Sequence, residues 1–429
     1  MRRVAERVIA PFAVDRRVLA LAGARMADGI GNSFLIIVIP LYVTSGVVGG
    51  TAFGLGESLI IGLILSLFGF LNSSCQPVTG RLSDRLGRRK PFILIGLAGL
   101  ALTNVAYVFA ETYVSLLVIR GLQGVSVAFI IPASVALVNE LASSGDRGGN
   151  MGVYNTFRLV GFGAGPAVAG AVVNLGPYTF PGGVTVNGFD AAFAIATITA
   201  TISYVLVTIL VSDPESTAAS AGADLSIPIL DRTGPNLLDP IFTLGLASFF
   251  MATGIALFAT IQPQVNARLE QGATWFGLQF AAFIIAQVAL QTPIGRACDR
   301  YGRRPFIVAG MVLLIPTTLV QGFVLSSVMM FFARLFQGVA AAMVFAPSLA
   351  LAGDLAGKGE SGSKLSVLTM AFGYGIAAGP LSSGALVGFG FRVPFVFGSV
   401  LAVLGTILVY TQVEETLETT ASVPVVGSS

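Results

Sequence analysis

Apolar runs long enough to cross a lipid bilayer occupy most of this 429-residue chain. About 20 helical residues span the roughly 30 Å hydrocarbon core, and twelve runs approach or exceed that length. They are continuously apolar, whereas the strands of a membrane barrel alternate over about ten residues, so these runs predict helices. With 55% hydrophobic and only 10% charged residues, lipid is the expected solvent. The predicted fold is an all-α membrane protein with twelve transmembrane helices, at 19–43, 53–78, 92–110, 113–141, 151–175, 189–211, 237–265, 276–294, 306–325, 328–355, 365–389 and 393–410.

Basic residues gather on one side of this predicted bundle. With the amino terminus placed inside the cell, most of the 24 Lys and Arg residues fall in inner segments, and the outer loops hold only Arg268 and Arg392. This positive-inside bias predicts a multi-pass protein of the cell (plasma or inner) membrane with both termini in the cytoplasm. The net charge of +3 follows from that topology and from attraction to anionic lipid, so it gives no support to a nucleic-acid partner. The basic lead at 1–17 is expected to be a cytoplasmic tail.

A polar motif between two apolar runs occurs twice. The pattern Gly-Arg-x-x-Asp-Arg-x-Gly-Arg-Arg stands at 80–89 and again at 295–304, and Arg-x-x-Gln-Gly stands at 120–124 and 334–338. Six predicted helices separate the copies, so both cross the membrane in the same direction and the repeat axis should lie along the membrane normal. The sequence therefore predicts two pseudo-symmetric six-helix bundles. Residues 1–211 form the first half, 212–236 a cytoplasmic linker, and 237–429 the second half with a short cytoplasmic tail.

These motifs resemble those of the major facilitator superfamily. The resemblance covers essentially the whole chain and rests on the 80–89 loop, the 120–124 stretch and Gly161-x-x-x-Gly165-Pro166-x-x-Ala169-Gly170. The last of these is similar to the signature of the drug:proton antiporter branch, with Ala169 where that pattern commonly has Gly. The resemblance implies a twelve-helix transporter of a small-molecule substrate, and we expect it to be a monomer.

The repeated loop is the predicted cytoplasmic gate. Basic residues alone would satisfy the positive-inside rule, but that reading leaves Asp84 and Asp299 unexplained. The resemblance implies that each of these carboxylates meets the cytoplasmic start of a helix from the other half, near 361–364 and 148–151 respectively. Glu140 and Asp354 are candidates to pair with Arg88 and Arg303. The predicted gate residues are Gly80, Asp84, Arg85, Gly87, Arg88, Arg89, Glu140, Asp299, Arg303 and Asp354.

Small residues in the fifth predicted helix form a packing motif. Gly161 and Gly165 are four apart, share a helix face and let a neighbouring helix approach closely in lipid. Close packing alone explains this spacing. The resemblance adds that the face, with Pro166 and Gly170, forms a seam that limits leak, which Gly375, Gly379 and Pro380 mirror in the other half.

Charged residues at membrane depth are the strongest functional signal, because each costs at least about 2.5–3.5 kcal/mol on insertion scales. Asp28 and Arg120 lie at similar predicted depth, and Gln123 shares a helix face with Arg120. Either a permanent ion pair fastens the first helix to the fourth, or the carboxyl cycles between protonated and ionised forms as proton coupling requires. Arg25 is three residues from Asp28 and could compete for it. The residues predicted for proton coupling and the substrate cavity are Asp28, Arg120, Gln123, Arg158 and Arg334.

No pattern in the sequence indicates an enzyme, a cofactor or a metal site. The chain has no His, no phosphate-cradling Gly-rich motif, and two Cys residues without metal-ligand spacing. Transport is then ion-driven or facilitative. The leading prediction is a secondary transporter working by alternating access, with proton-coupled efflux of small amphipathic or drug-like molecules. The alternatives are uptake or exchange of organic anions, motivated by Arg120, Arg158 and Arg334, and a non-transporting membrane sensor on the same fold.

Overall fold

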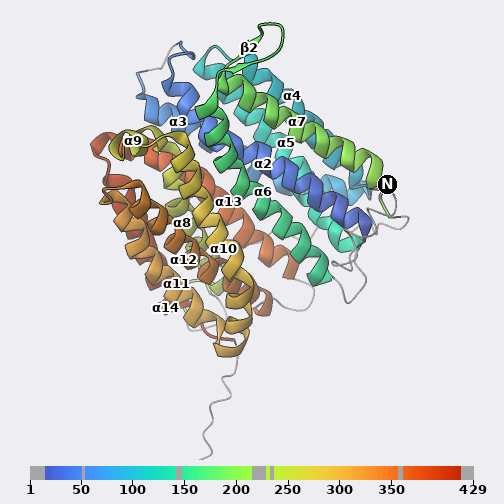
Figure 1. The fold of residues 1–429 in the computed structure, drawn as a ribbon. Helices are drawn as coiled ribbons and strands as arrows, with labels where there is room; N and C mark the ends of the chain where they lie inside the picture. Colours follow the sequence, from blue (N-terminus) through green and yellow to red (C-terminus); the bar gives the residue numbers. More distant parts are fainter. Residues whose placement is uncertain are drawn as a thin grey trace, which may run out of the picture.

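The computed structural model describes residues 15–50, 54–141, 147–214, 229–231, 236–355 and 361–416, and the helix count below refers to these. Twelve helices are long and apolar enough to cross a membrane, as predicted. In chain order (Figure 1) they are α2 (Arg16–Thr44), α3 (Glu57–Leu86), α4 (Lys90–Ala106), α5 (Tyr113–Glu140), α6 (Arg147–Leu175), α7 (Gly188–Leu210), α8 (Pro240–Thr260), α10 (Ala273–Tyr301), α11 (Arg303–Leu319), α12 (Ser327–Asp354), α13 (Ser361–Leu386) and α14 (Val393–Gln412).

Short elements complete the described chain. Three 3-10 turns extend α4, α11 and α13, and a short helix, α9 (Gln262–Arg268), follows α8. Strands β1 (Tyr178–Thr179) and β2 (Thr185–Val186) pair as a small antiparallel hairpin between α6 and α7.

The predicted helix limits differ from the structure in two places. The run at 237–265 is divided at Ile261, because Pro263 stands in the first turn of α9, where a proline fits a new helix start. The other prolines inside apolar runs do lie within continuous helices, as neighbouring helices allow in a membrane bundle. They are Pro40, Pro77, Pro132, Pro166, Pro293, Pro316, Pro347 and Pro380.

The second difference concerns the polar motif, which was predicted as a loop. Most of it is helical, since α3 continues to Leu86 and α10 continues to Tyr301. Asp84 and Asp299 therefore lie in the last turn of a helix. Gly87 ends α3 in the left-handed conformation, with φ 59° and ψ 24°, which glycine adopts without a Cβ penalty.

The twelve helices form two six-helix bundles, α2 to α7 and α8 to α14. Figure 1 shows the first bundle in blue to green beside the second in yellow to red. The closest helix pairs within the bundles are α2 with α6 and α8 with α13, and the bundles meet along α6 with α10 and α3 with α13. The predicted linker at 212–236 falls largely outside the described residues.

The bundles meet toward one side of the molecule. We call the side with Asp15, Gly87 and Gly302 the basic side and the side with α9 and the β1–β2 hairpin the opposite side. On the opposite side Gln264 Nε2 donates to Ser58 Oγ (2.7 Å) across the halves. Deeper in the bundle, Ser66 Oγ donates to the Ala377 carbonyl (2.6 Å). Contacts between the halves therefore close the opposite side, whereas in Figure 1 the basic-side ends of α6 and α10 lie apart.

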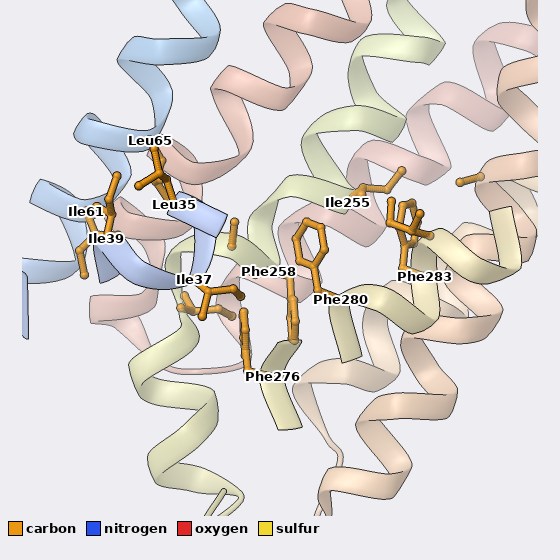
Figure 2. Close-up of a cluster of buried hydrophobic side chains, with 14 of the residues drawn as sticks. Leu35, Ile37, Ile39, Ile61, Leu65, Ile255, Phe258, Phe276, Phe280 and Phe283 are labelled. Carbon is orange, nitrogen blue, oxygen red and sulfur yellow. The ribbon is translucent and has the colours of Figure 1, made fainter. Parts of the chain in front are cut away.

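An apolar cluster supports that closed side. Figure 2 shows side chains from both halves in it, with Phe258 stacked on Phe276 at a ring-centroid distance of 4.3 Å and an interplanar angle of 4°. Ile37 of α2 and Ile61 of α3 belong to the same cluster. Aromatic stacking of this kind adds about 0.5–1.5 kcal/mol beyond the area buried.

Candidate functional site

Asp28 lies in the interior of the first bundle, and Arg25 is its partner. Asp28 is 3% exposed, and Arg25 donates through Nη1 to its Oδ2 one helical turn away. The predicted pair between Asp28 and Arg120 is wrong in this conformer. Residues three apart on one helix face already lie within reach of each other, so the local partner needs no approach by a second helix.

Arg120 is instead held by polar and aromatic side chains of its own half. Its Nη1 donates to Gln123 Oε1 (2.9 Å), which also accepts from the Tyr107 hydroxyl (2.9 Å). Gln123 Nε2 donates in turn to Asn104 Oδ1 (2.7 Å). The guanidinium carbon lies 4.5 Å from the ring centroid of Phe68, a favourable cation–π distance. The network joins α5 to α3 and α4.

The second half repeats this arrangement around Arg334. Arg334 Nη1 donates to Gln337 Oε1 (2.5 Å), and Gln337 Nε2 donates to Thr318 Oγ1 (3.0 Å). The guanidinium carbon lies 4.5 Å from the Phe258 ring centroid and 4.8 Å from that of Phe283. Both halves therefore use the same Arg, Gln and aromatic geometry.

The two halves differ in whether they hold an acidic residue at membrane depth. In the described helices of the second half, Asp and Glu occur only at Asp299 and Asp354, both near the basic side. The first half places Asp28 at membrane depth. Arg158 and Tyr154, both on α6, lie within electrostatic range of Arg25, so the cluster holds two guanidinium groups and one carboxylate.

On the basic side, Arg89 organises the first copy of the polar motif. It donates to Glu140 Oε1 through Nε (3.0 Å) and Nη2 (2.8 Å), and to Asp84 Oδ1 through Nη1 (2.5 Å). Burial alone would lower the pKa of Arg89, but these hydrogen bonds outweigh it and the pKa is raised. The predicted pair of Arg88 with Glu140 is wrong, since Arg88 is exposed and Arg89 occupies that place.

In the second copy, Arg303 fills this role as predicted. It pairs with Asp354 and with Asp299, and it donates to the Ala350 carbonyl (2.6 Å). The two copies use different members of the Arg-Arg pair because their turns differ. Gly302 has φ 100° and ψ 147°, and α11 begins directly at Arg303.

Asp84 and Asp299 each bond an arginine of their own half in this conformer. The side chains at 361–366 and 147–148, which include most of the partners expected in the other half, lie outside the described part of the chain. Of the remaining predicted gate residues, Arg85 is exposed. Gly80 packs on Pro132, and a Cβ added to Gly80 would lie 3.3 Å from the Pro132 Cβ.

The Gly-rich motif of α6 has two packing faces. A Cβ on Gly161 or Gly165 would strike the backbone of α2 at Met26 and Ile30, so this face holds the first bundle together. Pro166 and Gly170 face α10 instead, where Gly277 packs on the Pro166 carbonyl.

The second half mirrors both faces. An added Cβ on Gly375 would lie 2.5 Å from the Phe249 carbonyl of α8, within that half. Gly62 of α3 packs on the Pro380 carbonyl, where an added Cβ would lie 2.5 Å from the oxygen. One face of each motif therefore builds a bundle, and the other joins the two bundles.

Asn104 and Tyr107 were missed in the sequence. Asn104 is 4% exposed and also donates to the Ala196 carbonyl (2.9 Å), which ties α4 to α7. A polar residue within the apolar run at 92–110 was a usable signal. The repeat was a second signal, because the offset that relates Gln123 to Gln337 also relates Asn104 to Thr318.

We expect Arg89→Gln to destabilise the protein by about 2 kcal/mol, since hydrogen bonds to charged groups contribute about 1.5–3 kcal/mol. Arg88→Gln is the matched control, an exposed neighbour expected to stay within about 0.5 kcal/mol. The melting temperatures of the purified variants in detergent measure this. An equal or larger loss for Arg88→Gln would contradict the assignment of Arg89.

Relatives of known name resemble parts of this chain. Multidrug resistance protein 2 of Bacillus subtilis (strain 168) is 29% identical over 168 residues, 39% of this chain and 42% of that protein. Quinolone resistance protein NorA of Staphylococcus aureus (strain MSSA476) is 22% identical over 230 residues, 51% of this chain and 53% of that protein. The chain therefore aligns with about half or less of the length of these relatives.

Solved structures share the fold over most of the chain. The human organic anion transporter MFSD10 (TETRAN) superposes with a TM-score of 0.65 at 19% identity, covering 92% of this chain and 99% of that one. A bacterial homologue of the human lysosomal transporter Spinster, in an inward-facing and occupied conformation, superposes with a TM-score of 0.70 at 14% identity, covering 92% and 95%.

A family model that matches most of the chain identifies its family. Residues 21–265 and 244–424 fit the family model described as Major Facilitator Superfamily. With twelve membrane-spanning helices in two related bundles, the protein belongs to the Major Facilitator Superfamily, whose members are membrane transporters and not enzymes.

Proposed function

We propose that this protein is a secondary transporter that exports small amphipathic molecules in exchange for protons. The observation that carries the proposal is Asp28, an ionisable carboxyl buried at membrane depth beside Arg25. Charged groups within a membrane bundle are costly and mark ion pathways by default. A protonated Asp28 would release Arg25, and an ionised Asp28 would bind it again, so one proton changes the charge pairing in the first bundle.

The contacts between the halves support alternating access. The bundles meet on the opposite side through Ser58 with Gln264 and along the Pro166 and Pro380 seams, and the basic-side ends of α6 and α10 lie apart. Rocking the two bundles about a central site would close the basic side, where Asp84 and Asp299 would exchange their own-half arginines for partners in the other half. We place the basic side, with both termini, in the cytoplasm of a cell-membrane protein that works as a monomer.

Two observations bear on the substrate. The aligned relatives are named for multidrug and quinolone resistance, which supports export of drug-like amphiphiles. The buried charges of the described helices support a second candidate, an organic anion. At membrane depth, the described helices hold one acidic residue, Asp28. They hold four buried or half-buried arginines there, which are Arg25, Arg120, Arg158 and Arg334.

Transport by purified protein in liposomes with an imposed pH gradient tests the proposal. Ethidium serves as the cationic probe and carboxyfluorescein as the anionic probe. For one-for-one exchange against protons, a gradient of one pH unit stores about 1.4 kcal/mol, enough for about tenfold accumulation. We expect ethidium to accumulate and to be released when nigericin collapses the gradient, with protein-free liposomes as the control.

The other outcomes discriminate between the candidates. Gradient-driven movement of carboxyfluorescein without ethidium would select the organic-anion candidate. Accumulation of either probe to the same extent with and without the pH gradient would contradict proton coupling.

A further inference from the structure

Two small cavities border Asp28 inside the first bundle. One, of about 10 Å³, lies between Asp28 and the polar side chains Asn32, Asn104, Gln123 and Thr199. The other, also of about 10 Å³, lies on the basic side of Asp28 and is lined by Arg25 and Ser134 among apolar residues. The carboxyl therefore stands between two cavities.

The size and lining of these cavities fit water. A cavity needs about 10–15 Å³ to hold one water, together with two to four polar partners. The first cavity offers five polar side chains and the second offers Arg25, Asp28 and Ser134. Each therefore has the size and polar lining for one water beside Asp28.

The cavities follow the axis of the first bundle. Both are lined only by residues of α2, α4, α5 and α7, from Leu21 at the basic side to Leu35. At 1.5 Å per residue this stretch of α2 is about 21 Å long, a large part of the roughly 30 Å hydrocarbon core. No residue of the second half lines either cavity.

Polar contacts connect the first cavity to the surface where the halves meet. Gln123 lines the cavity and accepts from Arg120, whose guanidinium lies over Phe68 of α3. The next residue of α3, Gly69, packs on Ala377 of α13, where an added Cβ would lie 3.0 Å from the Ala377 Cβ. A shift of α13 against α3 thus acts next to Phe68, whose ring is one cation–π contact and one hydrogen bond away from Gln123 at the cavity.

We propose that water in these two cavities forms the proton route to Asp28 within the first bundle, separate from a substrate route between the halves. This inference rests on the proposed proton coupling. A proton carried by water binds Asp28 Oδ2 and breaks its bond to Arg25, and loss of that proton to water restores the pair. Asn104, Gln123 and Thr199 are positioning residues that hold the water.

The charged and titratable groups around Asp28 come from two helices. Arg25 faces it from its own helix, and Tyr154 and Arg158 come from α6. The side chains presented by α4, α5 and α7 at the cavities are neutral. A proton that reaches Asp28 through the cavities therefore meets no other titratable group on those helices.

Infrared spectroscopy of the carboxylic acid stretch tests this route without a transport substrate. The Asp28 band is assigned as the band that Asp28→Asn abolishes in a pH titration, and its exchange is then followed after transfer to D₂O. Ala200→Leu fills the first cavity, and Thr199→Val removes a hydroxyl from it at nearly constant volume. We expect each to slow exchange about tenfold, equivalent to about 1.4 kcal/mol of added barrier.

The same helix supplies matched controls. Ala194→Leu and Thr201→Val alter exposed positions of α7 and should leave the exchange rate unchanged. Unaltered exchange in both cavity variants, or no Asp28 band at any pH, would overturn the route. Slowed exchange in a protein that moves no probe under a pH gradient would keep the route and remove the proposed function. Proton-coupled transport together with unaltered exchange at Asp28 in the cavity variants would keep the proposed function and remove the route.

Discussion

Asp28→Asn is expected to abolish accumulation driven by a pH gradient while leaving downhill exchange of the same probe measurable. An amide cannot cycle between a neutral and an ionised form, so the charge pairing with Arg25 no longer changes during the cycle. The measurement compares gradient-driven with gradient-free probe movement in liposomes at several pH values. Asp190→Asn is the control, because it alters a half-buried carboxylate in the first turn of α7, near the opposite side.

Folding of the variant must be checked separately. Removing one partner of a buried ion pair costs about 3–5 kcal/mol, because the other charge is left uncompensated. Asp28→Asn combined with Arg25→Gln removes both charges and should melt at a higher temperature than Asp28→Asn alone. The double variant should still fail to accumulate the probe. Full gradient-driven transport by either variant would remove Asp28 as the proton carrier.

The choice of partner for Asp28 shows where sequence reasoning stopped. The depth of Asp28 could be predicted, because an acid within a continuous apolar run stands out against its neighbours. Its partner could not, because the orientation of Arg120 depends on Tyr107 and Phe68, which come from other helices. The local candidate, Arg25, was visible in the sequence at the i,i+3 spacing.

The two copies of the polar motif show a second limit. Their common pattern predicted a repeated structure, and both copies do form an Arg-centred network that includes Glu140 or Asp354. Which arginine bonds depends on one backbone turn, left-handed at Gly87 and extended with positive φ at Gly302. Both positions are glycine, so the sequence does not distinguish these conformations.

The packing motif was predicted correctly as a close helix contact, but its division into two faces was not. The spacing of Gly161 and Gly165 indicates one shared face, yet it does not say which helix approaches. The structure assigns that face to α2 and the Pro166 and Gly170 face to α10. A sequence pattern fixes the periodicity of a helix surface, whereas the neighbour on each face depends on the tertiary arrangement.

Gly170→Leu is expected to hold the halves apart on the opposite side, because a side chain at Gly170 strikes the backbone of α10 at Ala273. Overpacking costs about 1–3 kcal/mol, which shifts a two-state equilibrium by about 5- to 150-fold. Gly161→Leu strikes α2 within one bundle and should lower the melting temperature instead. Gly152→Leu is the control, since nothing lies within 4 Å of its added Cβ.

A disulfide across the seam reports this closure. Ser58 and Gln264, which bond across the halves, are replaced by Cys in a protein whose Cys75 and Cys298 are replaced by Ser. Oxidation should cross-link the parent and Gly152→Leu readily, and Gly170→Leu at least about fivefold less. Because the reporter lies on α3 and α9 and the added side chain on α6, a loss of cross-linking means that the bundles moved as rigid bodies. Undiminished cross-linking in Gly170→Leu would show that this face is packing without control over closure.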